Sequence, residues 1–400
     1  MYDLLVIGGG PGGATCARRA ALEGLDVVLI EKEVYPRPKA CGGALSPKVK
    51  DLLDFDFSKL IEREFNAAII HRPSGKSSIL TREGFRGYLI DREQFDEYLI
   101  NKAKEAGVEV IEGTEIIAIE QLRRGIRALS IGDSFKGHIL VGADGVNGIS
   151  MKQLGIKTKW AQDNIAVCIQ AEVPLTDGDI EKITSSSEEN EALAIELYYG
   201  LVEWGYGWCF PREHKLNIGI GCRLDKAKSL RDSWTIFCSQ LEKQKDLDLR
   251  INRQTSARVP VGGLEQRHVG RRAMLIGDAA GLVSPVSGEG ISYAIESGIL
   301  AARIAAESIK KKLPTHIIEY ERELRQSIER ELEDLRFLAK VLNKSHQNID
   351  LICTIADEDS LMREYLTDMV TRAGSSSELR GKITRQLITH HPLKAIKLRL

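Results

Sequence analysis

The first thirty residues follow the order strand, helix, strand in their pattern of apolar and small side chains. Leu4 to Ile7 form a continuous apolar run, and Asp26 to Ile30 form a second one that is almost as apolar. Runs of this length are typical of strands buried on both faces of a parallel sheet. Between them, the Ala-rich stretch from Gly12 to Glu23 predicts a helix. The pattern therefore predicts a βαβ unit, and with it a parallel sheet covered by helices.

A second set of apolar segments has the breaks of an antiparallel sheet. The segment AAIIHRPSGKSSILT contains two strand-like runs around a Pro-Ser-Gly turn. Further on, IAVCIQAEVPL, AIELYYG, GYGWCFPR and KLNIGIGCRL are rich in β-branched and aromatic residues and are interrupted by glycine. We therefore expect a second, β-rich unit in residues 61–89 and 156–264, inserted into the first.

Beyond Pro314 the pattern changes to the period of a helix. The segment from Thr315 to Lys344 carries Glu and Arg or Lys four residues apart, which favours a solvated helix. The last residues, 379–400, contain many basic and apolar side chains and almost no acidic ones. Two interpretations of this last segment stay open: a solvated basic tail or helix, or contact with an anionic lipid surface.

Three glycines follow the first predicted strand at the spacing of a dinucleotide-binding turn. Gly8, Gly10 and Gly13 form G-x-G-x-x-G. The first allows a tight turn, the second lets backbone amides approach a pyrophosphate, and the third lets helix and strand pack closely. Glu31 ends the second strand, where a carboxylate can accept hydrogen bonds from an adenosine ribose. The order of these features predicts a dinucleotide site.

Composition and charge exclude several other classes. The formal net charge of −1 over 400 residues gives no basic field, so we expect no nucleic-acid partner. The seven cysteines form no C-x-x-C pair and no zinc or iron–sulfur spacing, so we expect no metal and no closed disulfide framework. No stretch reaches about 18 consecutive apolar residues, and no secretion signal precedes the first strand. These features indicate a reducing, cytoplasmic location.

A second glycine-rich motif follows a predicted strand from Ala273 to Ile276. A Gly-Asp pair and a glycine-punctuated loop lead into a long helix at about Gly290. This motif resembles the second FAD fingerprint of the p-hydroxybenzoate-hydroxylase-like flavoproteins. The resemblance implies that FAD is the cofactor and that Asp278 bonds its ribitol chain. The loop with Pro285, Gly288 and Gly290 would run along the isoalloxazine ring, where a helix N-terminus stabilises the negative charge of a reduced flavin.

A third element of the same resemblance lies between the two motifs. Asp144 and Gly145 in ILVGADGVNGIS match an Asp-Gly motif, which implies a place near the FAD pyrophosphate. Group members that use a nicotinamide often continue with a serine and an arginine, where this chain has Gly148, Met151 and Lys152. Direct use of NADPH is therefore in question, and the electron donor stays open between NADPH, ferredoxin and another reductant.

Aromatic residues of one predicted strand form a stripe. Tyr206, Trp208 and Phe210 alternate along GYGWCFPR and so share one face of the strand. By themselves they fit an ordinary sheet core as well as a ligand pocket. Together with Pro211, the basic residue after it and the Cys-Gly-Gly triplet at Cys41, they resemble the geranylgeranyl reductase family. Within that family, the chain resembles the archaeal digeranylgeranylglycerophospholipid reductases in size and motifs.

This family resemblance implies a slot for an isoprenoid chain. The side chains assigned to the slot are Tyr206, Trp208, Phe210 and Pro211. The loop RPKACGGAL would then pass the flavin with Cys41, Gly42 and Gly43, and Arg92 of GYLIDREQFDEYL would belong to the same site. Alkene reduction needs a proton, for which Cys41, Tyr206 or an ordered water is a candidate. From the local sequence alone, Cys41 fits an inert loop residue equally well.

The expected fold class is α/β with an inserted α+β substrate sheet. The expected parts are a Rossmann-like FAD-binding domain (1–60, 90–155 and 265–310), a discontinuous β-rich substrate domain (61–89 and 156–264) and a helical C-terminal region (311–400). The resemblance implies an FAD-dependent oxidoreductase that saturates isolated double bonds of geranylgeranyl chains in archaeal-type membrane glycerolipids, by hydride transfer from reduced flavin. Its partners would be that lipid, a separate electron donor and, peripherally, the inner face of the cell membrane.

Other activities use the same motifs, because a fold does not determine a reaction. A flavin-dependent monooxygenase or halogenase would share every FAD motif, although the chain has no W-x-W-x-I-P halogenase motif. A quinone oxidoreductase of the electron-transfer-flavoprotein type would normally carry a cysteine-ligated cluster, for which the chain has no spacing. A non-catalytic flavin-binding protein is the remaining class, and absence of turnover with any reductant would distinguish it.

Overall fold

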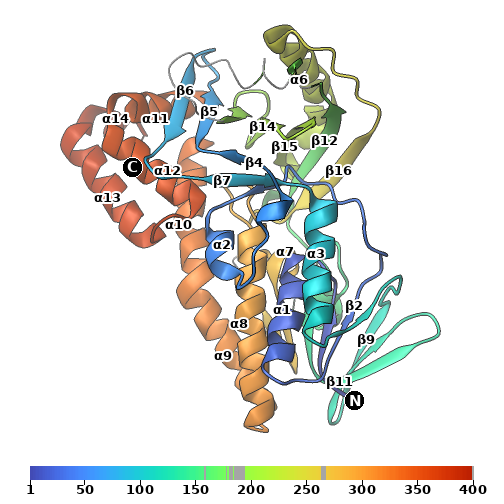
Figure 1. The fold of residues 1–400 in the computed structure, drawn as a ribbon. Helices are drawn as coiled ribbons and strands as arrows, with labels where there is room; N and C mark the ends of the chain where they lie inside the picture. Colours follow the sequence, from blue (N-terminus) through green and yellow to red (C-terminus); the bar gives the residue numbers. More distant parts are fainter. Residues whose placement is uncertain (157–158, 177, 180–182, 184–193, 263–266, 399–400) are drawn as a thin grey trace.

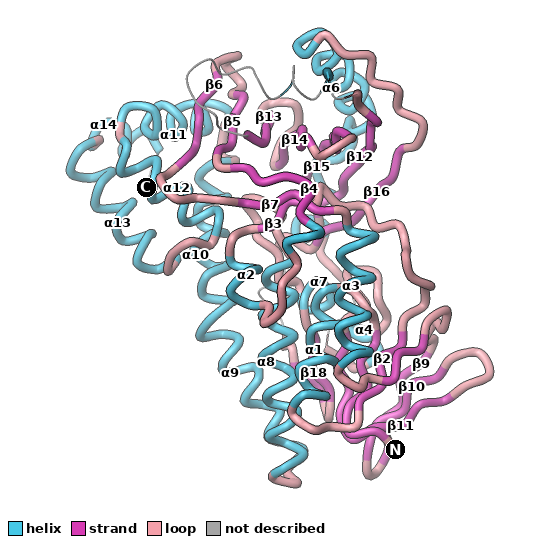
Figure 2. Tube along the Cα trace, in the orientation of Figure 1, coloured by secondary structure: helices cyan, strands magenta, loops and turns pink. Residues whose placement is uncertain are grey.

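Three parts of the molecule lie against one another: a sheet with long helices, a second sheet above it in the view of Figure 1, and a group of helices along one side. The computed structural model describes residues 1–156, 159–176, 178–179, 183, 194–262 and 267–398. Figure 2 separates the two strand-rich parts from the helices that end the chain. The mixed α/β architecture expected from the sequence is confirmed.

Eight strands of the described chain form the first sheet. Its parallel strands lie in the order β18 (Ala273–Leu275), β11 (Ser134–Gly142), β1 (Tyr2–Ile7), β2 (Val27–Ile30) and β8 (Glu109–Ile111). Strand β17 (Val269–Gly270) pairs with β18, and β9 (Ala118–Leu122) and β10 (Gly125–Leu129) form a meander on β11. The two glycine-rich motifs therefore leave the same sheet at β1 and β18, with β11 between these two strands.

Helices cover one face of this sheet and the meander covers the other. The longer helices on this face are α1 (Pro11–Leu22), α3 (Arg92–Glu105) and α8 (Ile291–Lys310), and the shorter ones are α2 (Lys48–Leu52) and α7 (Gly277–Ala280). Helix α4 (Ser150–Gln153) lies beside the meander, where Gln153 accepts a hydrogen bond from Ile119 of β9. Leu4 and Val6 pack toward the long helices, whereas Leu5 and Ile7 pack toward the meander. This alternation is why β1 is apolar at every one of these positions.

The second sheet has seven strands within the described residues. Their order is β16 (Gln254–Val259), β12 (Ala166–Pro174), β15 (Lys215–Arg223), β14 (Gly205–Pro211), β13 (Ala194–Tyr198), β5 (Ala67–His71) and β6 (Ser77–Thr81). Helix α6 (Leu230–Lys245) covers one face, on which Cys209 packs against Phe237. Trp208 and Phe210 belong to the opposite face, which looks toward the rest of the molecule.

A small sheet joins the two large ones, and its strands are β3 (Ala44–Leu45), β7 (Gly87–Ile90) and β4 (Ile61–Phe65). Short 3-10 turns connect elements at η1 (Ser58–Leu60), η2 (Gln162–Asn164), η3 (Leu224–Ser229) and η5 (Pro314–Ile317). Because β3 pairs with β7, the small sheet joins a strand of the expected segment 1–60 to strands of the expected segment 61–89. We keep the division into FAD-binding, substrate and C-terminal parts as a proposal.

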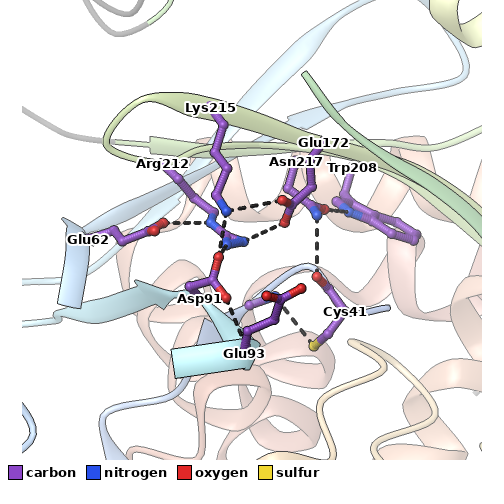
Figure 3. A network of polar contacts seen from close by, with 10 residues as sticks. Cys41, Glu62, Asp91, Glu93, Glu172, Trp208, Arg212, Lys215 and Asn217 are labelled. Carbon is purple, nitrogen blue, oxygen red and sulfur yellow. Dashed lines mark hydrogen bonds and ion pairs between the residues drawn. The ribbon is translucent and has the colours of Figure 1, made fainter. Parts of the chain in front are cut away.

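Arg212 holds the end of β14 against three other elements. Its guanidinium lies 2.6 Å from Glu62 of β4, 2.8 Å from Asp91 at the start of α3 and 2.8 Å from Glu172 of β12 (Figure 3). The residue is 1% exposed. Burial raises the pKa of Asp91, but hydrogen bonds from Lys215 and Arg212 outweigh it and hold that pKa well below its usual value. The ion pairs therefore hold the second sheet against the start of α3 and against β4.

The chain ends in a group of helices that pack on both sheets. They are α9 (Ile318–Leu324), the π-helical turn η6 (Arg325–Glu329), α10 (Arg330–Leu342), α11 (His346–Glu358), α12 (Ser360–Thr371), α13 (Ser376–His390) and α14 (Pro392–Leu398). The prediction of a solvated helix over 315–344 is wrong for one of its faces, because Tyr320, Leu324 and Leu335 are fully buried. The charged pattern hid an apolar stripe at helical spacing, which packs onto the first sheet and α8.

Candidate functional site

The glycine-rich turn between β1 and α1 leaves open space in front of the helix. Gly8 has a φ of 101°, which L side chains rarely adopt, and so allows the sharp turn. Gly10 caps α1, and nothing lies within 4 Å of the place a Cβ would take there. Gly13 packs directly on the backbone of Gly8. The free N–H groups of this helix end therefore face a position that suits an anionic pyrophosphate.

Glu31, just beyond β2, reaches back to this turn. Its Oε2 accepts a hydrogen bond from the backbone N–H of Gly9 at 2.6 Å, and Oε1 accepts one from Glu33 at 3.1 Å. The hydroxyl of Tyr35 donates to the Gly9 carbonyl at 2.6 Å. The carboxylate is buried and held at the end of the strand, where a ribose of a bound dinucleotide would lie.

The second glycine-rich motif brings Asp278 and the start of α8 to the same end of the sheet. Asp278 is half-buried at the beginning of α7. Burial raises the pKa of Asp278, and the positive charges of Lys39 and Arg92 lower it in part. The loop then passes Gly288 and enters α8 at its cap residue Gly290. Asp278 and the N-terminus of α8 therefore lie close together, since a Cβ at Gly290 would be 3.3 Å from Asp278 Oδ1.

Glu289 was not identified from the sequence. Its Oε1 accepts hydrogen bonds from the hydroxyl of Ser46 at 3.3 Å and from the backbone N–H of Ser292 at 3.2 Å. Its Oε2 is buried and has no hydrogen-bond partner among the described residues. Burial raises the pKa of this carboxyl. The only sequence feature that pointed to Glu289 was that it is an acidic residue in a loop of small residues.

Asp144 and Gly145 follow β11 on the other side of the turn. Asp144 Oδ2 accepts a hydrogen bond from the backbone N–H of Ser150 at 2.9 Å, while Oδ1 is buried without a partner in the part of the chain that the structure describes. Burial raises the pKa of Asp144, and the bonds from Ser150 oppose the shift. A Cβ at Gly148 would lie 2.1 Å from the Asp144 carboxyl carbon. This close approach explains why the chain has glycine at 148.

The loop that carries Cys41 lies on the aromatic face of β14. A Cβ at Gly42 would lie 2.8 Å from the ring of Phe210, so only glycine fits there. The carbonyl of Gly43 accepts a hydrogen bond from Ile90 of β7 at 3.0 Å. We expected these glycines to let the backbone approach a flavin. In the structure, their close neighbours are the Phe210 ring and Ile90.

Asn217 of β15 ties this loop to the aromatic stripe. Its side-chain amide donates a hydrogen bond to the carbonyl of Cys41 at 3.3 Å, and its Oδ1 accepts one from the indole N–H of Trp208 at 2.8 Å (Figure 3). Asn217 is completely buried. The sequence analysis missed it, although a polar residue inside the apolar strand KLNIGIGCRL was the signal.

Arg92, the first residue of α3, brings a positive charge to Cys41. Its guanidinium lies 2.8 Å from Asp96 and also interacts with the Cys41 thiol. Burial lowers the pKa of Arg92, but Asp96 and Cys41 outweigh burial and raise it. Arg37 is nearer to Cys41 in sequence, but it pairs with Asp96 at 3.2 Å. Arg92 is therefore the cation that faces the thiol.

Tyr206 connects the second sheet to the loop before α8. Its hydroxyl donates a hydrogen bond to the carbonyl of Ser287. A cavity of about 230 Å³ lies at this junction, and its walls include Tyr206, Trp208, Pro285 and Gly288. Burial raises the pKa of Tyr206 above its usual value, which disfavours loss of its proton. The junction therefore combines an aromatic wall with the loop of the second glycine-rich motif.

The other two members of the predicted slot lie beside this cavity. The ring centroids of Tyr206 and Trp208 are 6.3 Å apart, and those of Trp208 and Phe210 are 6.4 Å apart, so the three rings form one stripe. Phe210 packs on the Cys41 loop, and Pro211 ends β14; neither belongs to the lining of the cavity. The structure thus brings Tyr206 and Trp208 to the cavity and uses Phe210 to seat the loop.

Comparisons with known proteins agree with this geometry. Residues 3–168 match a family model described as FAD dependent oxidoreductase. A digeranylgeranylglycerophospholipid reductase of Methanocaldococcus jannaschii is 28% identical over 399 residues, which cover 92% of this chain and 98% of the relative. Digeranylgeranylglycerophospholipid reductase 2 of Methanococcoides burtonii is 30% identical over 321 residues, covering 78% of this chain and 76% of the relative.

Similarity in structure extends over the whole chain. A geranylgeranyl bacteriochlorophyll reductase-like protein from Thermoplasma acidophilum matches with a TM-score of 0.83 and 24% identity, covering 100% of this chain and 98% of the other. The match therefore includes both large sheets and the C-terminal helices as well as the nucleotide-binding part.

Proposed function

Because the chain belongs to the digeranylgeranylglycerophospholipid reductase family of FAD-dependent oxidoreductases, we propose that it saturates isolated double bonds in the geranylgeranyl chains of membrane glycerolipids. The cofactor is FAD. The observation that carries the proposal is the cavity at which Tyr206 and Trp208 meet the loop before α8. An isoprenoid chain has almost no hydrogen-bonding groups, so its affinity must come from buried area, at about 25 cal/mol per Å².

The residues around the first sheet fit FAD, and we assign them as follows. The open N-terminus of α1 at Gly10 would hold the pyrophosphate, with Asp144 nearby, and Glu31 would hold the ribose. Asp278 would hold the ribitol chain, and the loop that ends at Gly290 would run along the ring. The buried, unpartnered Oδ1 of Asp144 needs a hydrogen-bond donor, and the sugar and ribitol hydroxyls of FAD are donors, whereas its pyrophosphate only accepts.

The residues of the protein must position the alkene and supply a proton. When bound and reduced, FAD supplies a hydride to one carbon of the double bond, and the other carbon takes a proton. We assign the proton to Cys41, because its thiol interacts with Arg92 and its loop is tied by Asn217 to the aromatic stripe. The Tyr206 hydroxyl donates a hydrogen bond to the Ser287 carbonyl, and burial raises its pKa, so we assign Tyr206 to positioning the alkene. Position matters because no carbonyl polarises this double bond.

Access to a lipid substrate fits the C-terminal helices. No helix in the described ranges is long and apolar enough to cross a membrane. Helices α13 and α14 instead expose Ile388, Leu393 and Ile396, which are 62%, 75% and 72% exposed, and they carry Arg385 and Lys397 as well. Apolar side chains beside basic ones suit an anionic membrane surface. We propose peripheral contact through this face, at the inner side of the cell membrane.

The test is mass spectrometry of the lipid product. Protein reconstituted with FAD and reduced chemically, so that no natural electron donor is needed, is incubated with a glycerolipid that carries geranylgeranyl chains. We expect products heavier by two hydrogen atoms for each double bond reduced, and none with FAD-free protein. A product that gains oxygen, formed only in air, would support a monooxygenase instead. Unchanged lipid with fully reduced flavin would contradict the proposal.

A further inference from the structure

The cavity beside the loop before α8 also has three cations in its walls. Arg336 and Lys340 lie one turn apart on α10, and Arg223 ends β15; all three line the same cavity as Tyr206 and Trp208. Lys340 is exposed and Arg336 is half-buried, whereas Trp208 is buried. The cations therefore mark the rim of the cavity, and the aromatic wall marks its interior.

Positive charge at this rim exceeds negative charge. Arg223 is paired with Asp225 at 2.6 Å, so its charge is compensated. Arg336 donates a hydrogen bond to the carbonyl of Gly262 at 3.0 Å, which uses one N–H and leaves its charge in place. Among the described residues that line the cavity, Asp163 is the acidic one. Arg336 and Lys340 thus bring two positive charges against one carboxylate.

We propose that Arg336 and Lys340 bind the phosphate of the lipid substrate, so that the enzyme selects isoprenoid lipids with a phosphate ester over neutral ones. This inference rests on the proposed function and names the part of the substrate that the rim recognises. A guanidinium can donate two parallel hydrogen bonds to phosphate oxygens, and an ammonium adds a point charge. Because the cavity has buried aromatic side chains and more exposed cations, an amphiphile with an apolar chain and an anionic head matches both.

The proposed anchor also has a consequence for the reaction. A head group held at α10 limits how far the chain reaches toward Pro285 and Gly288, which line the same cavity. The distance between the phosphate and the flavin loop then decides which double bond lies at the reacting position. The rim is partly open to water, so its attraction for phosphate weakens as salt increases.

The test measures binding and therefore does not depend on turnover. The probes are phytanyl phosphate and phytanol, two saturated chains that differ only in the phosphate and cannot be reduced further. Binding is followed by the fluorescence of the tryptophans, because Trp204 and Trp208 line the cavity. The variants are Arg336→Gln with Lys340→Gln, Lys340→Glu alone, and Arg330→Gln as a matched control. Arg330 is an exposed cation of the same helix that does not line the cavity.

We expect the wild-type protein to bind phytanyl phosphate at least tenfold more tightly than phytanol. The double variant and Lys340→Glu should lose this preference by weakening only the phosphate ester, and Arg330→Gln should keep it. Equal loss for both probes would mean that these residues only shape the cavity, which would overturn the proposal. So would a protein that binds inorganic phosphate at these residues but shows no preference between the two lipids, because the site would then serve free phosphate. A preference for phytanyl phosphate without any alkene saturation would leave the subsite standing and reject the proposed function.

Discussion

Asn217 donates a hydrogen bond to the backbone carbonyl of Cys41 at 3.3 Å, although the two residues are 176 positions apart in the sequence. The same side chain accepts a hydrogen bond from the indole of Trp208 at 2.8 Å. One buried residue of the second sheet therefore sets the position of the cysteine loop relative to the aromatic wall. The thiol and the wall are held as a unit.

Replacing Asn217 by leucine should reduce activity more than stability. Asn217→Leu leaves the indole N–H and the Cys41 carbonyl without their partner, which costs about 1–3 kcal/mol for a buried group. We expect kcat for alkene saturation to fall about tenfold and the emission of Trp208 to change. The measurements are steady-state kinetics, fluorescence and thermal unfolding. Thr367→Val is the control, since Thr367 is also buried and donates to the Arg363 carbonyl at 2.8 Å within α12, and neither residue lines the cavity. Equal losses of kcat in both variants would reject the positioning role.

Replacing Cys41 by serine should separate flavin reduction from alkene saturation. Cys41→Ser should keep FAD bound and allow its chemical reduction, but lower saturation at least tenfold, or roughly 1.4 kcal/mol of transition-state stabilisation. The reason is that serine is a much weaker acid, even beside Arg92. Single-turnover reoxidation of the flavin by lipid measures the step directly. Cys238→Ser, at a half-buried thiol on α6, is the control. Wild-type rates in Cys41→Ser would make the thiol dispensable.

Membrane contact should depend on the exposed apolar side chains of the last two helices. Deleting residues 379–400 is a poor test, because Leu379, Leu387 and Leu398 are buried in the core. The triple substitution Ile388→Ser, Leu393→Ser and Ile396→Ser changes only exposed positions. We expect it to reduce co-sedimentation with anionic vesicles several-fold.

The control for this experiment is Ile131→Ser. Ile131 is 89% exposed in the turn between β10 and β11, outside the C-terminal helices. The substitution Ile131→Ser removes an exposed apolar side chain of the same kind, so vesicle binding should stay at the wild-type level. Binding of the triple variant that equals the wild type would assign membrane contact to another face.

Acid should weaken the second sheet through Glu196. Burial raises the pKa of this carboxyl, but hydrogen bonds from His71 and Lys245 outweigh it and lower the pKa to about 2. Because the folded pKa lies below the usual 4.5, the stabilisation is complete above pH 4.5 and is lost as the pH falls toward 2. The full contribution is on the order of 3 kcal/mol. Wild-type protein should therefore lose more of its thermal midpoint between pH 5 and pH 3 than Glu196→Gln. Parallel losses in the two proteins would contradict this prediction.

Local patterns predicted much of the fold. The strands at Leu4–Ile7 and Asp26–Ile30 were expected as β1 and β2, which run from Tyr2 to Ile7 and from Val27 to Ile30. The long helix expected at about Gly290 is α8, which begins at Ile291. These predictions succeeded because burial on both faces, glycine turns and helix starts leave a mark within a few neighbouring residues. The buried stripe around Tyr320 and Leu335 was missed because frequent ion-pair spacings concealed it.

The sequence by itself determined the α/β class, the two glycine-rich motifs and the aromatic stripe of Tyr206, Trp208 and Phe210, because each depends on spacing along one element. Only the tertiary structure decided which residues surround Cys41. Arg92 reaches the thiol from α3, and Asn217 reaches its carbonyl from β15. Contacts between elements depend on the order of strands and on how whole sheets dock. The sequence pattern around residue 41 does not indicate these contacts, because a backbone carbonyl or a thiol can interact with any suitable partner that the fold brings close.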